Sequence, residues 1–391
     1  MDITLWKAWM ATVFSKLVEN RQRIACVLFY GYYAFLVMAK GLGYSNGSFF
    51  YQLLFFTGVV LWLGKMLLTD YSLREIVTIA IFLAIALWMY AKLGELTGIL
   101  LLMTIAGLKN CNFEILMKIT MVIRVFTSAV VIAFSAVGLL PQNAIGILEQ
   151  DYSFRYVYGF DYGKHNLLFL SGFLTVVAML YVYYDKLNMY WFVGTLIPMV
   201  ILYKLTYCRT GILLFVLMWL MIGWDKLCKW KGLNRLYCLA YVFGFCTSFL
   251  ATVIYRPGHL GMQKINHIFN GRISIANTYF RTVGFSLLPR DISIFSFNLN
   301  RIIDNLYMSL AITSGLLIAL LFVYLITKTS YKLLLGKNNK ELLFLVIFAI
   351  YAILEEFPLN PSMNPFIMLL AILLYRDKFI LRGNEIGRKE A

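Results

Sequence analysis

The sequence predicts an all-α membrane protein that forms a single domain over residues 1–391 and crosses the bilayer about twelve times. Hydrophobic residues make up 61% of the chain, which is more than the core of a water-soluble protein can bury. Apolar runs that approach the roughly 20 residues needed to cross a bilayer recur from one end to the other. Only 14% of the residues are charged, but the net charge is +16, so contact with lipid headgroups or another anionic partner is expected.

The expected spans follow one another with short polar turns between them, and the shorter ones are compatible with a kinked or half-buried pair. In chain order they are residues 24–39, 49–68, 76–91, 95–108, 117–140, 167–184, 189–205, 211–223, 236–255, 304–327, 342–354 and 362–375. No small-residue cleavage site follows the first span, where the chain reads Tyr44, Ser45 and Asn46. This span is therefore expected to stay as an anchor and not to be removed as a signal peptide.

The distribution of basic residues predicts the orientation, because Lys and Arg in short loops are retained on the cytoplasmic side of a membrane. If the spans alternate, the basic clusters all fall on one side: the N-terminus with Lys7, Lys16, Arg21 and Arg23, the turns at 226–235 and 328–340, and the tail at 376–389. Both termini are then expected in the cytoplasm. The opposite side receives the segments where function is expected: the outer loop 141–166, the large outer loop 256–303, and the turns 206–210 and 355–361.

The large outer loop 256–303 is basic, although the orientation rule favours few basic residues on this side. Against the single acid Asp291 it carries Arg256, Lys264, Arg272, Arg281, Arg290 and Arg301. An arginine fork binds phosphate oxygens through two hydrogen bonds, so this cluster favours a pyrophosphate carried on a lipid. The alternative is that these side chains extend along the apolar surface to lipid headgroups.

The outer loop 141–166 ends in a polar stretch, RYVYGFDYGKHN, directly before a span. Its polar residues could face one pocket at the membrane surface: Arg155, Asp161, Lys164, His165 and Asn166. The alternative is a helix entry that Asn166 caps. The other histidines, His259 and His267, also fall in outer loops and are interpreted as structural hydrogen-bonding residues.

Two further polar groups are expected at the outer face. One is a basic turn formed by Cys208, Arg209, Thr210 and Gly211. Thr210 and Gly211 could cap the next helix, whose N-terminal amides add positive potential for an anion. The alternative is that Arg209 extends to the lipid headgroups. Three polar residues, Asp304, Asn305 and Tyr307, begin one span, where Asp304 is expected to act mainly as a cap; two acids, Glu355 and Glu356, end another. Acids at a helix C-terminus need partners, so we expect them to pair with the arginines of the adjacent loops.

This order of outer motifs, over about residues 140–370, resembles the O-antigen polymerase (Wzy) and ligase superfamily, whose membrane domain belongs to the class C glycosyltransferases. The matching residues are Gly159, Phe160, His165 and Asn166; Cys208, Arg209, Thr210 and Gly211; Asn270, Gly271 and Arg272; Asp304, Asn305 and Tyr307; and Glu355, Glu356, Asn364 and Pro365. The chain departs from the family pattern at two places: a proline is missing between His165 and Asn166, and Cys208 stands where the family has serine.

The resemblance implies an inverting glycosyltransferase in the bacterial cytoplasmic membrane that transfers a growing glycan from undecaprenyl pyrophosphate to the next lipid-linked repeat at the outer leaflet. Arg209 and Arg272 would stabilise the leaving diphosphate, and Arg155, Lys164 and Arg281 would hold its phosphates. His165 is the first candidate for the base, with Glu355 or Glu356 behind it. The other residues expected to bind substrate are Asn166, Asp304, Asn305 and Tyr307.

No cofactor is expected, because the sequence has no DxD motif for a divalent metal and its cysteines form no CxxC pair. Activity is therefore expected to persist in EDTA. The expected partners are the lipid-linked donor and acceptor, membrane lipid and a chain-length regulator as a candidate protein partner, and no nucleic acid. A ligase that hands the glycan to a different acceptor, and a flippase or exporter with arginines along a translocation route, stay open as alternatives.

Overall fold

The computed structural model describes residues 3–44, 47–140, 143–146, 154–157, 165–227, 235–292, 303–375 and 381, with side chains from residue 20 onward except at 143–146, 154–157, 165 and 166. Apart from one short antiparallel pair of strands, the secondary structure of these residues is helical, as the sequence predicts. In chain order the elements are α1 (Ile3–Leu42), α2 (Phe49–Leu68), α3 (Leu73–Leu93), α4 (Thr97–Gly107), α5 (Phe113–Ala136), β1 (Asn143–Gly146), β2 (Phe154–Val157), α6 (His165–Val182), η1 (Tyr184–Lys186), α7 (Met189–Thr206), α8 (Arg209–Leu227), α10 (Ala240–Ile254), α11 (Leu260–Ile268), α12 (Arg272–Val283), α14 (Leu306–Ser309), η2 (Leu310–Ser314), α15 (Leu316–Leu335), α16 (Asn339–Tyr351), η3 (Phe357–Leu359), η4 (Pro365–Leu370) and α17 (Ala371–Tyr375).

Seven of the described helices are long and apolar enough to cross a membrane: α1 from Asn20 to Leu42, α2, α3, α5, α7, α8 and α15. Shorter apolar helices cover Thr97–Gly107, Leu167–Val182, Ala240–Ile254 and Pro365–Tyr375, where spans were also expected. Many large apolar side chains on the long helices stay exposed, among them Leu67 and Leu73, as expected where lipid is the solvent. The chain thus has the helices of a multi-pass membrane protein, and the count of about twelve crossings stays a prediction.

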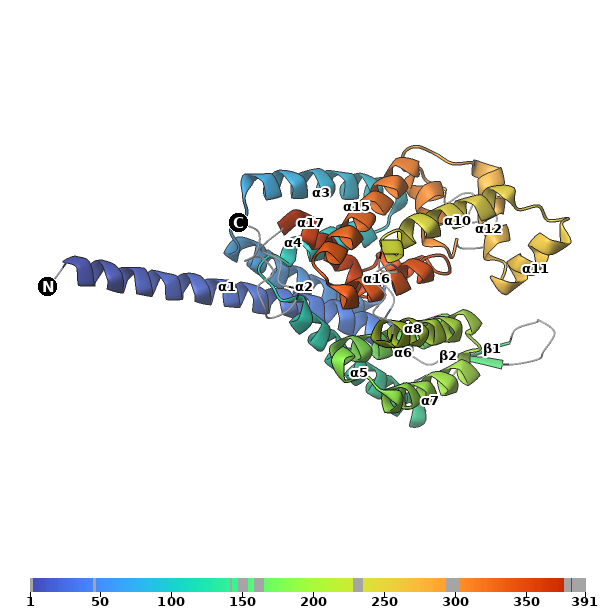
Figure 1. The fold of residues 1–391 in the computed structure, drawn as a ribbon, viewed down its shortest axis with the longest axis horizontal. Coiled ribbons are helices and arrows are strands. Elements are labelled where there is room, and N and C mark those ends of the chain that lie inside the picture. Colours follow the sequence, from blue (N-terminus) through green and yellow to red (C-terminus); the bar gives the residue numbers. More distant parts are fainter. Residues whose placement is uncertain are drawn as a thin grey trace.

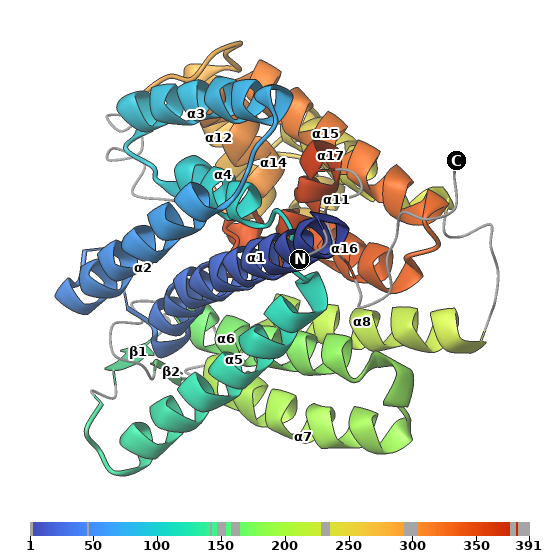
Figure 2. The ribbon, with the colours of Figure 1, turned by 90° about the vertical axis from the view of Figure 1, so that its left-hand side faces the viewer.

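The helices form two groups on either side of α1 and α16 (Figures 1 and 2). In both views α5, α6, α7 and α8 lie on one side, and α3, α4 and α15 lie on the other. Nearly every residue of α16 is buried, including the charged Lys340 and Glu341. The hydroxyl of Tyr181 on α6 donates to Glu341 over 2.8 Å, and the Lys340 ammonium lies 3.9 Å from the Tyr181 ring centroid. These contacts provide partners for two charges in the interior of the bundle.

The start and the end of the described chain lie at the same end of the bundle. Arg21 of α1 pairs with Asp70, whose carbonyl accepts from Lys109, and the Tyr375 hydroxyl donates to Ala106. We call this the termini end. The opposite end, which we call the loop end, carries β1–β2, α11 and α12 (Figure 1). The expected cytoplasmic location of the termini stays a prediction, but their placement on one side agrees with it.

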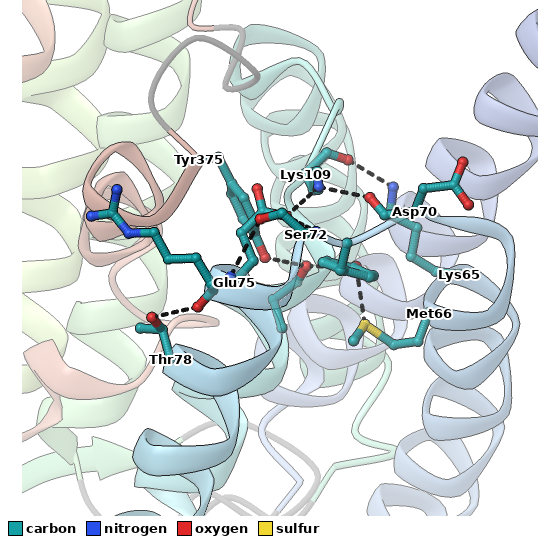
Figure 3. A network of polar contacts seen from close by, with 11 residues as sticks. Lys65, Met66, Asp70, Ser72, Glu75, Thr78, Lys109 and Tyr375 are labelled. Carbon is teal, nitrogen blue, oxygen red and sulfur yellow. Dashed lines mark hydrogen bonds and ion pairs between the residues drawn. The ribbon is translucent and has the colours of Figure 1, made fainter.

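A buried polar network joins α2, α3 and the α4–α5 turn at the termini end (Figure 3). Lys109, whose side chain is 1% exposed, forms an ion pair with Glu75, and the Lys65 ammonium donates to the Lys109 carbonyl over 2.7 Å. Glu75 also accepts from the backbone of Ser72, which completes a capping box at the start of α3. This network was not predicted, because each of its members is an isolated polar residue in or beside an apolar span.

The span expected at 304–327 is broken into α14, the π-helical turn η2 and α15. Gly315 separates η2 from α15 with φ +93° and ψ 153°, a conformation that is essentially restricted to glycine. The segment 286–290 lies against this break: Arg290 donates its backbone N–H to the Thr313 carbonyl over 3.1 Å, and the Leu316 amide donates to the Ser286 carbonyl over 2.8 Å. The break therefore attaches the large outer loop to the membrane helices.

We expect Gly315→Ala to lower the free energy of unfolding by about 3 kcal/mol. A Cβ atom at this position would lie 2.6 Å from the Leu287 carbonyl oxygen, in addition to the unfavourable backbone conformation. Gly223→Ala is the matched control, because Gly223 lies inside α8 with no atom near its added Cβ. Thermal unfolding of the detergent-purified variants measures both. Equal midpoints for the two variants would contradict the expectation.

Candidate functional site

Arg272 enters the site from an Asn-Gly turn between α11 and α12. Asn270 and Gly271 both have positive φ, +51° and +80°, and the Gly271 amide donates to the Asn266 carbonyl over 2.8 Å. The Asn266 side chain then accepts from the Ser274 amide over 2.9 Å, which fixes the first turn of α12. Residues 256–303 were expected to form a loop. The structure instead shows the helices α11 and α12 and the turn between them.

Arg272 forms a buried ion pair with Glu355. Its Nη2 lies 2.7 Å from Oε1 of Glu355, and the two side chains are 6% and 16% exposed. The expectation that an acid at 355–356 pairs with an arginine of an adjacent loop is confirmed for Glu355. Within the described part of the chain, the Nε and Nη1 atoms of Arg272 are buried and have no hydrogen-bond partner. Buried charged donors without partners are costly, so an anionic ligand is expected to complete this group.

Glu355 is held by a turn after α16 that α14 supports from behind. The Leu306 amide donates to the Ala352 carbonyl over 2.9 Å, and the Tyr307 hydroxyl donates to Ala349 over 2.8 Å. Asn305 donates to Ile353 over 2.9 Å and to Ser248 over 3.0 Å, and its side-chain oxygen caps α14. The polar atoms of Asn305 and Tyr307 are thus engaged within the protein. These contacts position the turn that carries Glu355, and the expected role of both residues in substrate binding stays a prediction.

The turn between α7 and α8 lies next to this ion pair. Cys208 is buried, and the raised pKa of its thiol comes first from burial, with the nearby Glu355 carboxylate adding to the rise. The α8 helix begins at Arg209, so Thr210 and Gly211 lie in its first turn and not at the predicted cap. Arg209 is exposed, and no described acid pairs with it. The Arg209 guanidinium and the N-terminal amides of α8 therefore lie beside Cys208, which itself neighbours Glu355.

Gly211 allows α8 to approach α6 closely. A Cβ atom at Gly211 would lie 2.2 Å from the Phe169 ring, and Phe173, one turn further along α6, packs edge-on against Tyr351 at 5.4 Å between ring centroids. The helix position of His165 precedes Phe169 by four residues and therefore lies on the same face of α6.

The side chains predicted at this corner, Arg155, Lys164, His165 and Asn166, lie outside those that the structure describes. The backbone shows α6 beginning at His165, so Asn166 falls in its first turn instead of capping it.

Several predicted site residues are not brought together with Arg272. Arg281 lies nine residues further along α12, which is about 14 Å in a helix, and its guanidinium donates to the Tyr255 carbonyl over 3.2 Å. Asp304 is half-buried, and Asn305 is the cap that had been expected at Asp304. Glu356 is exposed and faces Ser309, whose hydroxyl lies 3.5 Å away, in a separate small cavity. The two neighbouring glutamates therefore point to different places.

The basic loop residues also separate from one another. His259 caps α11 by accepting from the Met262 amide over 3.4 Å, in agreement with its structural interpretation. Arg290 donates to the Gly284 carbonyl within its own loop, and burial lowers the pKa of its guanidinium. Arg256 and Lys264 are exposed. Among the described basic residues of this loop, Arg272 is the one buried beside an acid.

Arg124 is a buried cation that was not among the predicted site residues. It lies in α5, is 2% exposed, and donates to the Ser362 carbonyl over 2.6 Å. Tyr33 of α1 donates to the neighbouring Pro361 carbonyl over 3.0 Å. Both contacts hold the segment that follows Glu355. The signal was present in the sequence, because Arg124 is a charged residue inside the apolar span expected at 117–140.

Taken together, the described site has one buried arginine with two unpaired donors, its carboxylate partner, an exposed arginine and two helix N-termini at the loop end of the bundle. Such a group can bind an anion and accept a proton. Among the described residues, no three His, Cys, Asp or Glu side chains gather into a metal site. No protein-family model matches the chain, and comparison with curated proteins and with solved structures finds no significant match.

Proposed function

We propose that this chain is a Wzy-type polymerase of the bacterial cytoplasmic membrane, which joins oligosaccharide repeats carried on undecaprenyl pyrophosphate at the outer leaflet. The observation that carries the proposal is the buried Arg272–Glu355 pair, in which Arg272 keeps two unpaired donors. These donors suit the oxygens of a diphosphate, which a guanidinium binds through paired hydrogen bonds. Arg272 begins α12, which lies at the loop end opposite the termini (Figure 1), where the outer leaflet is expected.

The reaction forms a bond between a sugar hydroxyl of the acceptor and the anomeric carbon of the donor glycan, and it breaks the bond from that carbon to the diphosphate. The diphosphate leaves with negative charge, so no general acid is required. Arg272 stabilises this charge as it develops, and Arg209 holds the same group from the start of α8. Direct displacement inverts the anomeric configuration. NMR assignment of the anomeric configuration in the product linkage and in the donor checks this expectation.

The acceptor hydroxyl must lose its proton to a base. Glu355 is our first candidate among the described residues, because it is paired with Arg272 and is therefore ionised, whereas Glu356 faces a separate cavity. When a diphosphate binds Arg272, the positive charge is shared, and Glu355 becomes a better proton acceptor. His165, the first candidate from the sequence, is placed second here, because only its backbone position at the start of α6 is described.

The alternatives make different demands on the chain. A flippase or exporter of lipid-linked oligosaccharide needs a polar route through the spans, whereas the larger described cavity is lined mainly by apolar side chains. A ligase uses the same donor chemistry as a polymerase. The two are separated by the length of the product, because a ligase adds one block to a different acceptor and a polymerase extends the chain step by step.

The test is a polymerisation assay with purified protein in nanodiscs and synthetic repeats linked to undecaprenyl pyrophosphate. We expect a ladder of products from the parent chain that persists in EDTA, and a strong reduction in Arg209→Ala. Lys264→Ala is the matched control, because Lys264 is an exposed cation of the large outer loop that takes no part in the site. A parent chain that is folded but makes no ladder from repeats of its own host would contradict the proposal.

A further inference from the structure

A cavity of about 470 Å³ is lined by residues of α3, α4, α15 and α17. Its volume is in the range of small-molecule sites in proteins. On α3 its wall includes Thr78, Phe82 and Ala86, and on α15 it includes Leu321 and Leu325, so each helix contributes residues spaced three or four apart. The cavity is therefore a long apolar groove that runs along two helices.

Three cations line this groove at the termini end: Arg74, Lys328 and Lys332. Arg74 is in the first turn of α3, next to Glu75 of the network that also holds Lys109. Lys332 donates to the Ile372 carbonyl over 3.4 Å, and Lys328 lies one turn before it on α15. The described residues that line the cavity include no carboxylate, so the charged residues of its lining are all basic.

The other end of the groove has the opposite charge. A smaller cavity shares Met89, Gly98, Leu310 and Leu359 with the groove and continues it toward the loop end. This cavity is lined by Glu95 and Glu356. The groove thus has carboxylates at one end and three cations at the other. An anionic lipid is expected to bind in one orientation, because its headgroup is attracted to the cations and repelled by the acids.

We propose that this groove is a binding site for an anionic glycerophospholipid of the leaflet at the termini end. The phosphate binds Arg74, Lys328 and Lys332, and an acyl chain lies along the apolar wall between α3 and α15. Anionic lipids are concentrated in the cytoplasmic leaflet, which is where the predicted orientation places these three cations. The site is separate from the Arg272–Glu355 site, which lies at the loop end, and does not depend on the proposed glycosyl transfer.

Native mass spectrometry of the full chain, released from detergent with added phosphatidylglycerol or phosphatidylcholine, tests the site. We expect the parent to retain phosphatidylglycerol in preference to phosphatidylcholine. The variant Arg74→Ala/Lys328→Ala/Lys332→Ala is expected to bind phosphatidylglycerol more weakly by about tenfold or more, because each cation near a lipid phosphate contributes to binding. Arg235→Ala is the control, since Arg235 is an exposed cation outside the groove.

Two further variants keep the result interpretable. Arg74→Ala/Lys328→Ala leaves the Lys332 contact to Ile372 in place and changes only exposed side chains, so it is expected to fold and still to lose affinity. Gly98→Leu fills the groove and keeps all three cations, because the added Cβ atom meets Ala86 only at an ordinary contact distance of 3.7 Å. Unchanged retention in both variants overturns the proposal. Equal retention of phosphatidylcholine, or displacement of phosphatidylglycerol by an equimolar polyprenyl phosphate, also overturns it.

Discussion

Arg272→Ala is expected to reduce the rate of glycan polymerisation by about 10²–10³-fold, the usual effect of removing a group that stabilises developing negative charge. The parent guanidinium has one donor on Glu355 and two buried donors without partners among the described residues, so it can bind a diphosphate without breaking its ion pair. Alanine removes all three donors. Single-turnover formation of the first dimer of repeats measures the effect on the chemical step.

The Lys and Gln variants separate a catalytic loss from a structural one. Arg272→Lys keeps the charge but loses the planar fork, so we expect it to fold and to recover only part of the rate. Glu355→Gln keeps the shape of the acid and removes the proposed base; we expect a loss in rate with little change in donor affinity. Thermal unfolding is measured for each variant. A folded Arg272→Ala protein that makes the full product ladder would remove Arg272 from the reaction.

Glu75→Ala is expected to lower the free energy of unfolding by about 3–5 kcal/mol, because it leaves Lys109 as a buried charge without its carboxylate. Lys109 is 1% exposed and Glu75 10% exposed, so water does not readily replace the lost partner. The network in Figure 3 also joins the α4–α5 turn to the start of α3, and the loss is therefore expected to affect both. Denaturant or thermal unfolding in a fixed detergent measures the change.

A second substitution tests the cause. Adding Lys109→Met to Glu75→Ala removes the unpaired charge, so we expect the double variant to be more stable than Glu75→Ala alone. Glu114→Gln is the matched control, because Glu114 pairs with Lys118 one turn away on a surface where the two side chains are 30% and 53% exposed. It should change stability by no more than about 0.5 kcal/mol. The single variant Lys109→Met is measured as well. A double variant whose loss in unfolding free energy equals the sum of the losses in the two single variants would contradict the expected coupling.

Part of the candidate site could be predicted, because some of its charged residues are energetically costly without a partner of opposite charge. An acid at a helix C-terminus and an arginine in an outer loop both require partners, and Glu355 and Arg272 are found paired. The sequence could not select Arg272 from the other basic residues of the loop. That selection depends on the Asn270–Gly271 turn, which starts α12 beside the end of α16, and on Arg281 being carried about 14 Å away by the same helix.

The amount and spacing of apolar residues were enough to predict a helical membrane protein, because they require lipid as the solvent whatever the details of packing. The sequence also predicted that the basic turns lie together on one side. The folded structure was needed to show that Gly315 breaks a span, that Asn305 and Tyr307 support a turn, and that Arg124 and Lys109 are buried with polar partners. The reason is that hydrophobicity acts locally on each segment, whereas hydrogen bonds and ion pairs join residues far apart in the chain and depend on the packing of whole helices.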